Sequence, residues 1–170
     1  MQHTQGHSRN SETRAEPDIE PDARKQIATS LNSLLADLFA LYIKTKNYHW
    51  HMTGQHFRDY HLLLDEQAVQ IFDTTDAMAE RVRKLGKPTI RSIGQIARLQ
   101  KISDDDSEQT DSIAMLKALL TDNRVIVSRL REAHEVCDTH RDLATASLIE
   151  NWIDDAERRV WFLYETVGSN

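Results

Sequence analysis

The stretch that decides the fold is NYHWHMTGQHFRDYHLLLDEQ, residues 47–67. It places four histidines and an aspartate of metal-ligand type beside a tryptophan: His49, His51, His56, His61, Asp65 and Trp50. Thr53 and Gly54 interrupt it, as expected where one helix ends and another begins. His61 and Asp65 are four residues apart, so on a helix both side chains face the same way. The stretch therefore indicates two helices with candidate metal ligands on both.

Apolar residues recur every third or fourth position on both sides of this break, which is typical of amphipathic helices. The upstream helix is predicted over residues 23–52, with Asp22 as its N-cap. The downstream helix is predicted over residues 55–85 and ends in basic residues before a glycine and a proline. The same spacing predicts two more helices, over residues 112–137 and 142–165.

The connections between these helices decide the topology. Residues 86–111 form a long connection with one short helical patch, whereas the other two connections are short. Short, long and short connections predict two helix hairpins joined by a crossover, which is an all-α ferritin-like four-helix bundle with a short extra helix. The expected domain plan is a disordered tail over residues 1–22, the bundle over 23–166 and a short C-terminal tail over 167–170.

Composition limits the class of protein. The chain has 170 residues, of which 39% are hydrophobic and 28% charged, as in a soluble domain. It contains no run of eighteen apolar residues and no signal-peptide pattern, so we expect a cytoplasmic protein without a membrane segment. The net charge of −6 argues against a simple polyanion binder. The single cysteine, Cys137, lies in a helical pattern and is predicted to be a reduced core thiol.

Four candidate ligands on the second helix form a near-palindrome, His-x3-Asp-x10-Asp-x3-Glu: His61, Asp65, Asp76 and Glu80. Either pair alone is common on a solvated helix face. Asp65 and Asp76 are separated by about 16 Å along one helix, whereas metal–ligand bonds are about 2 Å long. One chain therefore supplies only half-sites. If a second copy packs antiparallel about a two-fold axis near residues 70 and 71, the half-sites meet and form two equivalent sites.

The upstream helix contributes further candidates. His49 lies near its end and is predicted to complete a five-ligand set. Trp50 is a candidate electron donor to a reactive oxygen intermediate or a filler of the dimer interface, and both interpretations remain open. His51 points to the other side of the helix, so we expect a surface or outer-shell role for it. His56 is interpreted as structural.

The donor set suggests the metal. Two imidazoles and three carboxylates suit a mid-row divalent ion, and iron(II) fits if open positions remain for an oxidant. Zinc also fits and would compete for the site. Carboxylates favour iron(III) as it forms, because hard anionic oxygens offset the added charge. No histidine has a glutamate three residues before it, so the Glu-x-x-His pattern of larger di-iron bundles is absent.

The segments KNYHWHMTGQHFRDYHLLLDEQ and DTTDAMAERVRKLG resemble the Dps proteins, or mini-ferritins, and the resemblance covers about residues 24–165. It implies ferroxidase ligands at His49, His61 and Asp65 of one subunit, with Asp76 and Glu80 from its two-fold mate. The family tryptophan falls on Trp50. The resemblance also implies a hollow dodecamer that oxidises iron(II) with hydrogen peroxide in preference to oxygen, stores ferric mineral and protects against oxidative damage.

DNA binding and iron entry are separate expectations. Residues 1–24 carry three arginines and five acids, and twelve copies at −6 each total about −72, so DNA binding is disfavoured. Acids near the start of the last helix are candidates for a three-fold pore: Asp138, Asp142 and Glu150. The alternative functions are a nucleoid-compacting protein and a zinc-loaded scaffold without ferroxidase turnover.

Overall fold

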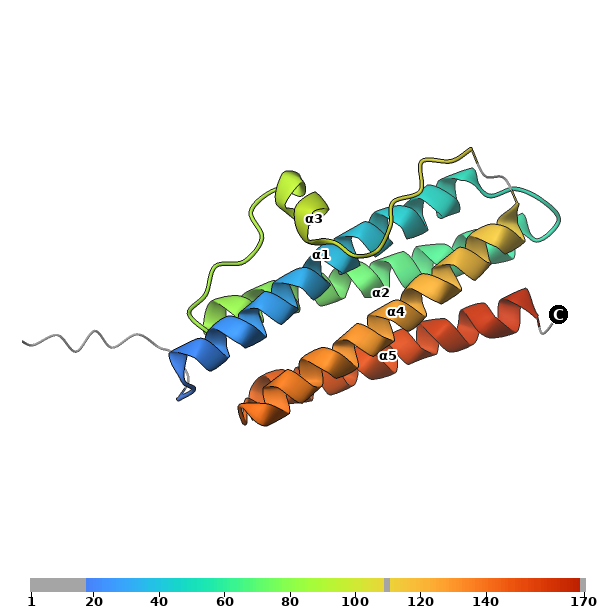
Figure 1. Ribbon diagram of the computed structural model, residues 1–170. Helices are drawn as coiled ribbons and strands as arrows, with labels where there is room; N and C mark the ends of the chain where they lie inside the picture. The colour runs from blue at the N-terminus through green and yellow to red at the C-terminus, as the bar shows by residue number, and fades with distance from the viewer. Residues whose placement is uncertain (1–17, 109–110, 169–170) are drawn as a thin grey trace, which may run out of the picture.

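Four long helices and one short helix make up the described part of the chain, residues 18–108 and 111–168 of the computed structural model (Figure 1). They are α1 (Pro21–His51), α2 (Phe57–Lys84), α3 (Ile93–Leu99), α4 (Ser112–Thr139) and α5 (Leu143–Val167). The α1–α2 and α4–α5 pairs are antiparallel hairpins, and the crossover that carries α3 runs along α1. The predicted all-α ferritin-like bundle with a long crossover is confirmed.

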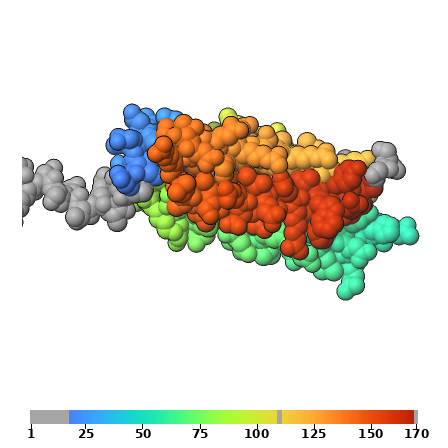
Figure 2. Space-filling view, turned by 90° about the horizontal axis from the view of Figure 1, so that it is seen from below, coloured from blue at the N-terminus to red at the C-terminus, as the bar shows by residue number. Residues whose placement is uncertain are grey.

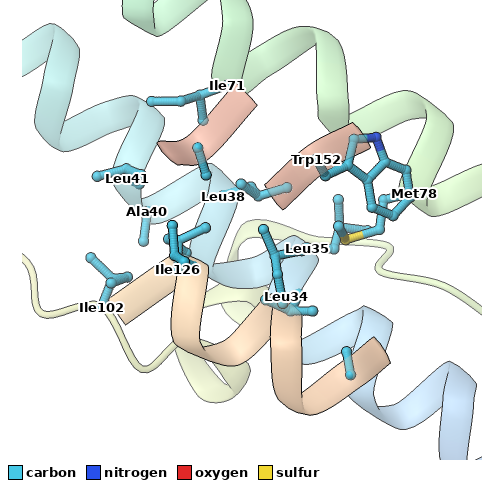
Figure 3. Packing of buried hydrophobic residues seen from close by; sticks show 14 of the residues in the cluster. Leu34, Leu35, Leu38, Ala40, Leu41, Ile71, Met78, Ile102, Ile126 and Trp152 are labelled. Carbon is cyan, nitrogen blue, oxygen red and sulfur yellow. The ribbon is translucent and has the colours of Figure 1, made fainter. Parts of the chain in front are cut away.

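One apolar core joins the four long helices. Figure 3 shows side chains from every layer of it: Leu35 and Leu38 from α1, Ile71 and Met78 from α2, Ile126 from α4 and Trp152 from α5. Burying a single leucine or isoleucine contributes roughly 1.5–3 kcal/mol. The three-to-four spacing in the sequence therefore builds the bundle directly, because each helix turns its apolar stripe towards the same axis.

The first helix begins earlier than expected. Glu20 occupies the N-cap position of α1 and Pro21 the first helical position, so the prediction of Asp22 as N-cap is wrong. Proline suits this position because its fixed φ matches the helix and its missing N–H would have no helical partner. Asp22 lies in the first turn, where its charge favours the positive end of the helix dipole. Residues 1–17 of the predicted tail lie outside the described residues.

A buried ion pair fixes the crossover to the bundle. Asp37 of α1 is fully buried and pairs with Arg129 of α4. Its Oδ1 also accepts the backbone N–H groups of Lys101 and Ile102, at 2.5 and 3.0 Å. One carboxylate thus links α1, α4 and the segment that follows α3.

Asp142, a predicted pore residue, lies in the turn between α4 and α5, and its surroundings contradict that prediction. Asp142 is 2% exposed, caps α5 through the backbone N–H of Thr145, and accepts a hydrogen bond from Arg81 at 2.8 Å. It holds α2 against α5 and lines no opening, because its carboxylate is used by these contacts. Cys137 nearby is buried, as predicted, and burial raises the pKa of its thiol to about 12.

By length and composition, α1 is the one helix in the described ranges that could span a membrane. Its most apolar window has a mean hydropathy of 1.2, and 56% of that window is buried within the bundle. Its contacts with α2 and α4 account for this apolar character, because they bury the stripe in the common core.

Candidate metal centre

Two histidines on neighbouring helices hold each other in place. His49 near the end of α1 and His61 in the first turns of α2 lie face to face, with ring centroids 3.7 Å apart. Nδ1 of His49 is 2.8 Å from the carbonyl oxygen of His61, and Nδ1 of His61 is 2.9 Å from the carbonyl oxygen of His49. A carbonyl oxygen only accepts hydrogen bonds, so the proton of each neutral ring lies on Nδ1. This leaves the Nε2 lone pair of each ring available to a metal ion.

Asp65 completes this half of the predicted site. It lies one turn after His61 on α2, and its Oδ1 is 3.8 Å from Nε2 of His49. The side chain of Asp65 is 52% exposed, whereas that of His49 is 9% exposed. The structure thus brings together the three ligands predicted from one subunit: two nitrogens held on a rigid helix pair and one carboxylate open to solvent.

Lys46 is a functional candidate that the sequence prediction missed. Its Nζ lies 2.8 Å from Oδ1 of Asp65 and 5.9 Å from the centroid of the Trp50 ring. The hydrogen bond from Lys46 is the largest cause that lowers the pKa of Asp65, followed by the attraction between the two charges. Its position one turn before His49 was the signal that could have identified it, because residues at that spacing share a helix face.

The other two predicted ligands lie farther along α2. Asp76 and Glu80 are exposed, and Glu80 pairs with Lys84, at 3.3 Å, across one helical turn. His49, His61 and Asp65 lie close together, but in the described ranges of one chain neither they nor any other three histidine, cysteine or acidic side chains are arranged closely enough to hold a metal ion by themselves. The geometry of one copy therefore separates the five predicted ligands into a group of three and a group of two.

Trp50 and His51 border a cleft on the other side of α1. The cleft has a volume of about 620 Å³ and lies between α1 and the crossover segment 104–108. Trp50 is 60% exposed, and Nδ1 of His51 is 2.8 Å from the carbonyl oxygen of Asn47. Neither ring is part of the histidine pair. His56 precedes α2 and lies against Tyr60, with ring centroids 5.6 Å apart.

Asp105 lines this cleft, and hydrogen bonds hold its side chain in place. Asp105 accepts hydrogen bonds from the Tyr48 hydroxyl and from both the backbone N–H and the hydroxyl of Ser107. These bonds to the charged form lower the pKa of Asp105 to about 2. Burial and the neighbouring Asp105 raise the pKa of Tyr48, so its hydroxyl stays protonated and remains a donor.

The remaining pore candidates flank a histidine. Nδ1 of His134 is 3.3 Å from Asp138, and its Nε2 is 3.1 Å from Glu150. Asp138 and Glu150 are both exposed, so they are accessible from solvent in a way that Asp142 is not. They join the end of α4 to the first half of α5.

Comparisons with known proteins identify the family and the fold of the chain. The sequence profile of the ferritin-like domain matches residues 28–169. The "DNA protection during starvation protein" of Halobacterium salinarum is 31% identical over 142 residues, which cover 82% of this chain and 76% of that protein. The protein of the same name from Brevibacillus brevis is 30% identical over 138 residues, which cover 81% of this chain and 91% of that protein. The structure of DpsC from Streptomyces coelicolor superposes with a TM-score of 0.87 at 27% identity, covering 91% of each chain.

Proposed function

The chain belongs to the Dps family of ferritin-like proteins, and from that premise we propose that it is a ferroxidase whose sites are shared between two copies. Its substrate is iron(II), its oxidant is hydrogen peroxide or oxygen, and it stores the ferric product. The observation that carries this proposal is the reciprocal hydrogen bonding of His49 and His61 beside Asp65.

The histidine pair supports a transition-metal substrate. Both rings are held by hydrogen bonds to backbone carbonyls, which fixes the tautomer and the direction of Nε2 before the metal arrives. The nitrogens suit iron(II), and the carboxylate of Asp65 adds the hard oxygen that iron(III) prefers. Zinc accepts the same donors and is expected to compete with iron.

An exposed stripe along α2 supports a second copy as the source of the other two ligands. Large apolar side chains along it face solvent in the single chain: Leu62 is 46%, Val69 55% and Phe72 49% exposed. Successive residues of a helix are rotated by about 100°, so these three positions and the four candidate ligands of α2 all lie within one arc of about 100° around the helix. Exposed apolar residues in such a row are typical of an interface.

The order of residues in the stripe favours an antiparallel mate. Val69 and Phe72 lie equally far from the point between residues 70 and 71 about which the ligands are mirrored. A two-fold axis at that point therefore sets Val69 against Phe72 of the second copy, and brings Asp76 and Glu80 to Asp65 and His61. The two resulting sites are separated by about 22 Å along the helices.

The proposed reaction balances with two iron ions at each site. Two iron(II) ions each lose one electron, and one hydrogen peroxide takes up both electrons and two protons to give two waters. The O–O bond breaks in a two-electron step, so no free hydroxyl radical is released. The three carboxylates stabilise the products because each iron gains one positive charge.

Lys46 and Trp50 have proposed roles beside the ligands. The ammonium group of Lys46 contacts Oδ1 of Asp65, so we propose that it competes with iron(II) for this oxygen. The Trp50 ring lies beside the Lys46 ammonium group, and we propose that it either supplies an electron to an oxidising intermediate or packs against the second copy.

The experiment that tests this proposal mixes metal-free protein with iron(II) and hydrogen peroxide and follows ferric absorbance. His61→Ala and Asp65→Ala should each lower the initial rate by about tenfold or more. Glu80→Ala should impair the same centre. Asp59→Asn is the matched control, because this exposed acid lies on α2 but outside the stripe. Equal rates in all of these proteins would refute the site.

Storage requires a closed assembly of dimers. We propose a dodecameric cage in the cytoplasm, with Asp138 and Glu150 as candidates for the acidic lining of an iron-entry pore. Light scattering of the purified protein should give a mass of about twelve chains. A stable dimer that oxidises iron but retains none would separate ferroxidase activity from storage and contradict this part of the proposal.

The names of the relatives favour DNA protection as a second candidate function, exerted directly or through iron and peroxide removal. The net charge of −6 per chain favours the indirect route. A gel shift at low and moderate salt distinguishes the two, because salt-resistant binding would establish direct contact. A zinc-loaded scaffold, the remaining alternative, would contain metal at the ligands and show no peroxide-dependent oxidation.

A further inference from the structure

Two buried polar atoms between α2 and α5 have no hydrogen-bond partner in the described structure: Nη1 of Arg159 and Oε1 of Gln67. Four other buried side-chain atoms also lack a hydrogen bond, but their residues take part in ion pairs or other polar contacts: Arg24, Asp37, Asp122 and Arg129. Buried donors and acceptors are normally satisfied, so two unsatisfied groups on residues that contact each other indicate a further ligand.

Both atoms belong to residues that line one recess, on the face where α2 and α5 lie side by side (Figure 2). Leu63 and Phe162 form apolar walls, and the exposed residues Arg158 and Glu66 lie at the mouth. The volume of the recess is about 20 Å³. A site for one water molecule needs about 10–15 Å³ on the same measure, so the recess admits one oxygen atom with its hydrogen.

The floor of the recess carries a buried positive charge. Arg159 is 3% exposed, and its Nε donates to Oδ1 of Asn123 at 2.8 Å. Asn123 is neutral and is itself oriented by donating to the carbonyl of Leu119. Burial lowers the pKa of Arg159 to about 10, and Asp155 offsets this only in part. No carboxylate of the described chain lies within ion-pair distance of this guanidinium, and buried cations are normally paired.

We propose that the recess binds one oxygen of a small oxyanion that carries a proton, of the hydrogen phosphate or hydrogen carbonate class. That oxygen accepts from Arg159, and its proton is donated to Oε1 of Gln67. Gln67 keeps this orientation because its Nε2 faces the carbonyl oxygen of Arg159, at 3.5 Å. The charged oxygens stay at the mouth beside Arg158, whose guanidinium lies 5.5 Å from the Phe162 ring centroid.

The hydrogen-bond pattern separates this ligand class from two simpler occupants. Water satisfies both unpartnered atoms but leaves the charge of Arg159 uncompensated. Sulfate supplies charge but carries no proton at neutral pH, so it would set an oxygen lone pair against Oε1 of Gln67. Glu66 opposes any anion at the mouth, and its removal should therefore favour binding.

Calorimetric titration of the metal-free, full-length protein tests the proposal with inorganic phosphate and sulfate at pH 7 and constant ionic strength. Phosphate should bind at least about tenfold more tightly than sulfate, because sulfate leaves a buried acceptor unpaired. Equal affinities would overturn the proposal. If neither phosphate nor sulfate gave a heat of binding, the proposal would also be overturned, and water would be the occupant of the recess.

Variants at the mouth locate the binding without disturbing the core. Arg158→Gln should weaken phosphate binding by about tenfold, and Glu66→Gln should strengthen it. Arg91→Gln is the matched control, because it removes the same charge from an exposed residue of the crossover. If both mouth variants bind phosphate as the control does, the site lies elsewhere. No iron is present, so this outcome is independent of ferroxidase activity.

Discussion

The Nδ1–H groups of His49 and His61 each donate a hydrogen bond to the other residue's backbone carbonyl, across the junction of α1 and α2. The two contacts close a symmetrical pair in which each residue is both a candidate ligand and the support of its neighbour. The helix break at Thr53 and Gly54 makes this possible, because it returns the chain so that the two residues lie side by side. Local structure and proposed chemistry thus depend on the same turn.

Replacing His61 with asparagine should separate these two roles. The asparagine amide keeps a donor near the His49 carbonyl but supplies no imidazole nitrogen to iron. We expect the melting temperature to change little, while the ferroxidase rate falls by about tenfold or more. Circular dichroism melting and ferric absorbance measure the two effects. His56→Asn is the control, and equal ferroxidase rates in the two variants would contradict the assignment.

A charge at the centre of the α2 stripe should disrupt the proposed dimer. Val69 is 55% exposed, so Val69→Glu can be accommodated in the single chain. Around the proposed two-fold axis, however, it would bury a carboxylate against an apolar partner, which is strongly unfavourable. Sedimentation velocity should show smaller species, and iron oxidation should fall with them. Val69→Ala is the uncharged control, because it removes the valine side chain without adding a charge, and it should retain assembly better than the charged variant.

The acid sensitivity of the crossover should depend on Asp105. Its pKa is lowered to about 2, so the folded state prefers the charged carboxylate. The resulting stabilisation is present above the unfolded pKa of about 4 and is lost as pH falls from about 4 to about 2. Wild type should therefore melt at a higher temperature than Asp105→Asn at pH 6, with a gap that narrows towards pH 3. If the difference in melting temperature did not change with pH, the stabilisation would not come from the lowered pKa of Asp105.

Breaking the buried ion pair of α1 and α4 should be costly. Asp37→Ala leaves Arg129 without its carboxylate and two crossover N–H groups without an acceptor. We expect a loss of about 3–5 kcal/mol in the free energy of unfolding, measured by urea titration. Lys84→Gln removes an exposed ion pair and should cost about 0–1 kcal/mol. A similar cost for both variants would show that burial is not the cause.

The sequence allowed the fold to be predicted because helical spacing and loop lengths are local properties. The apolar stripes predicted all four long helices, and the long connection predicted the crossover with its short helix. Most observed helix ends differ from the predicted ends by only a few residues. The convergence of His49, His61 and Asp65 was also predictable, because one break in a helical pattern brings its two flanks together.

Contacts between distant segments were not predictable in the same way. The sequence suggested Asp142 as a pore acid, and only the fold shows that it is buried and paired with Arg81, sixty-one residues earlier. Gln67 and Arg159 lie ninety-two residues apart in the sequence, yet they line one recess. Lys46 shares a helix face with His49, but its partner Asp65 lies on the next helix. In each case the partner is set by packing and not by spacing along the chain.

Co-assembly of two inactive variants tests the shared-site account most directly. One chain carries His61→Ala and Asp65→Ala, the other Asp76→Ala and Glu80→Ala, and each alone should oxidise iron poorly. When the chains are unfolded, mixed equally and refolded, every mixed dimer contains one intact site. Random pairing should therefore restore about a quarter of the wild-type ferroxidase rate. No recovery from correctly reassembled mixtures would contradict a site built from two copies.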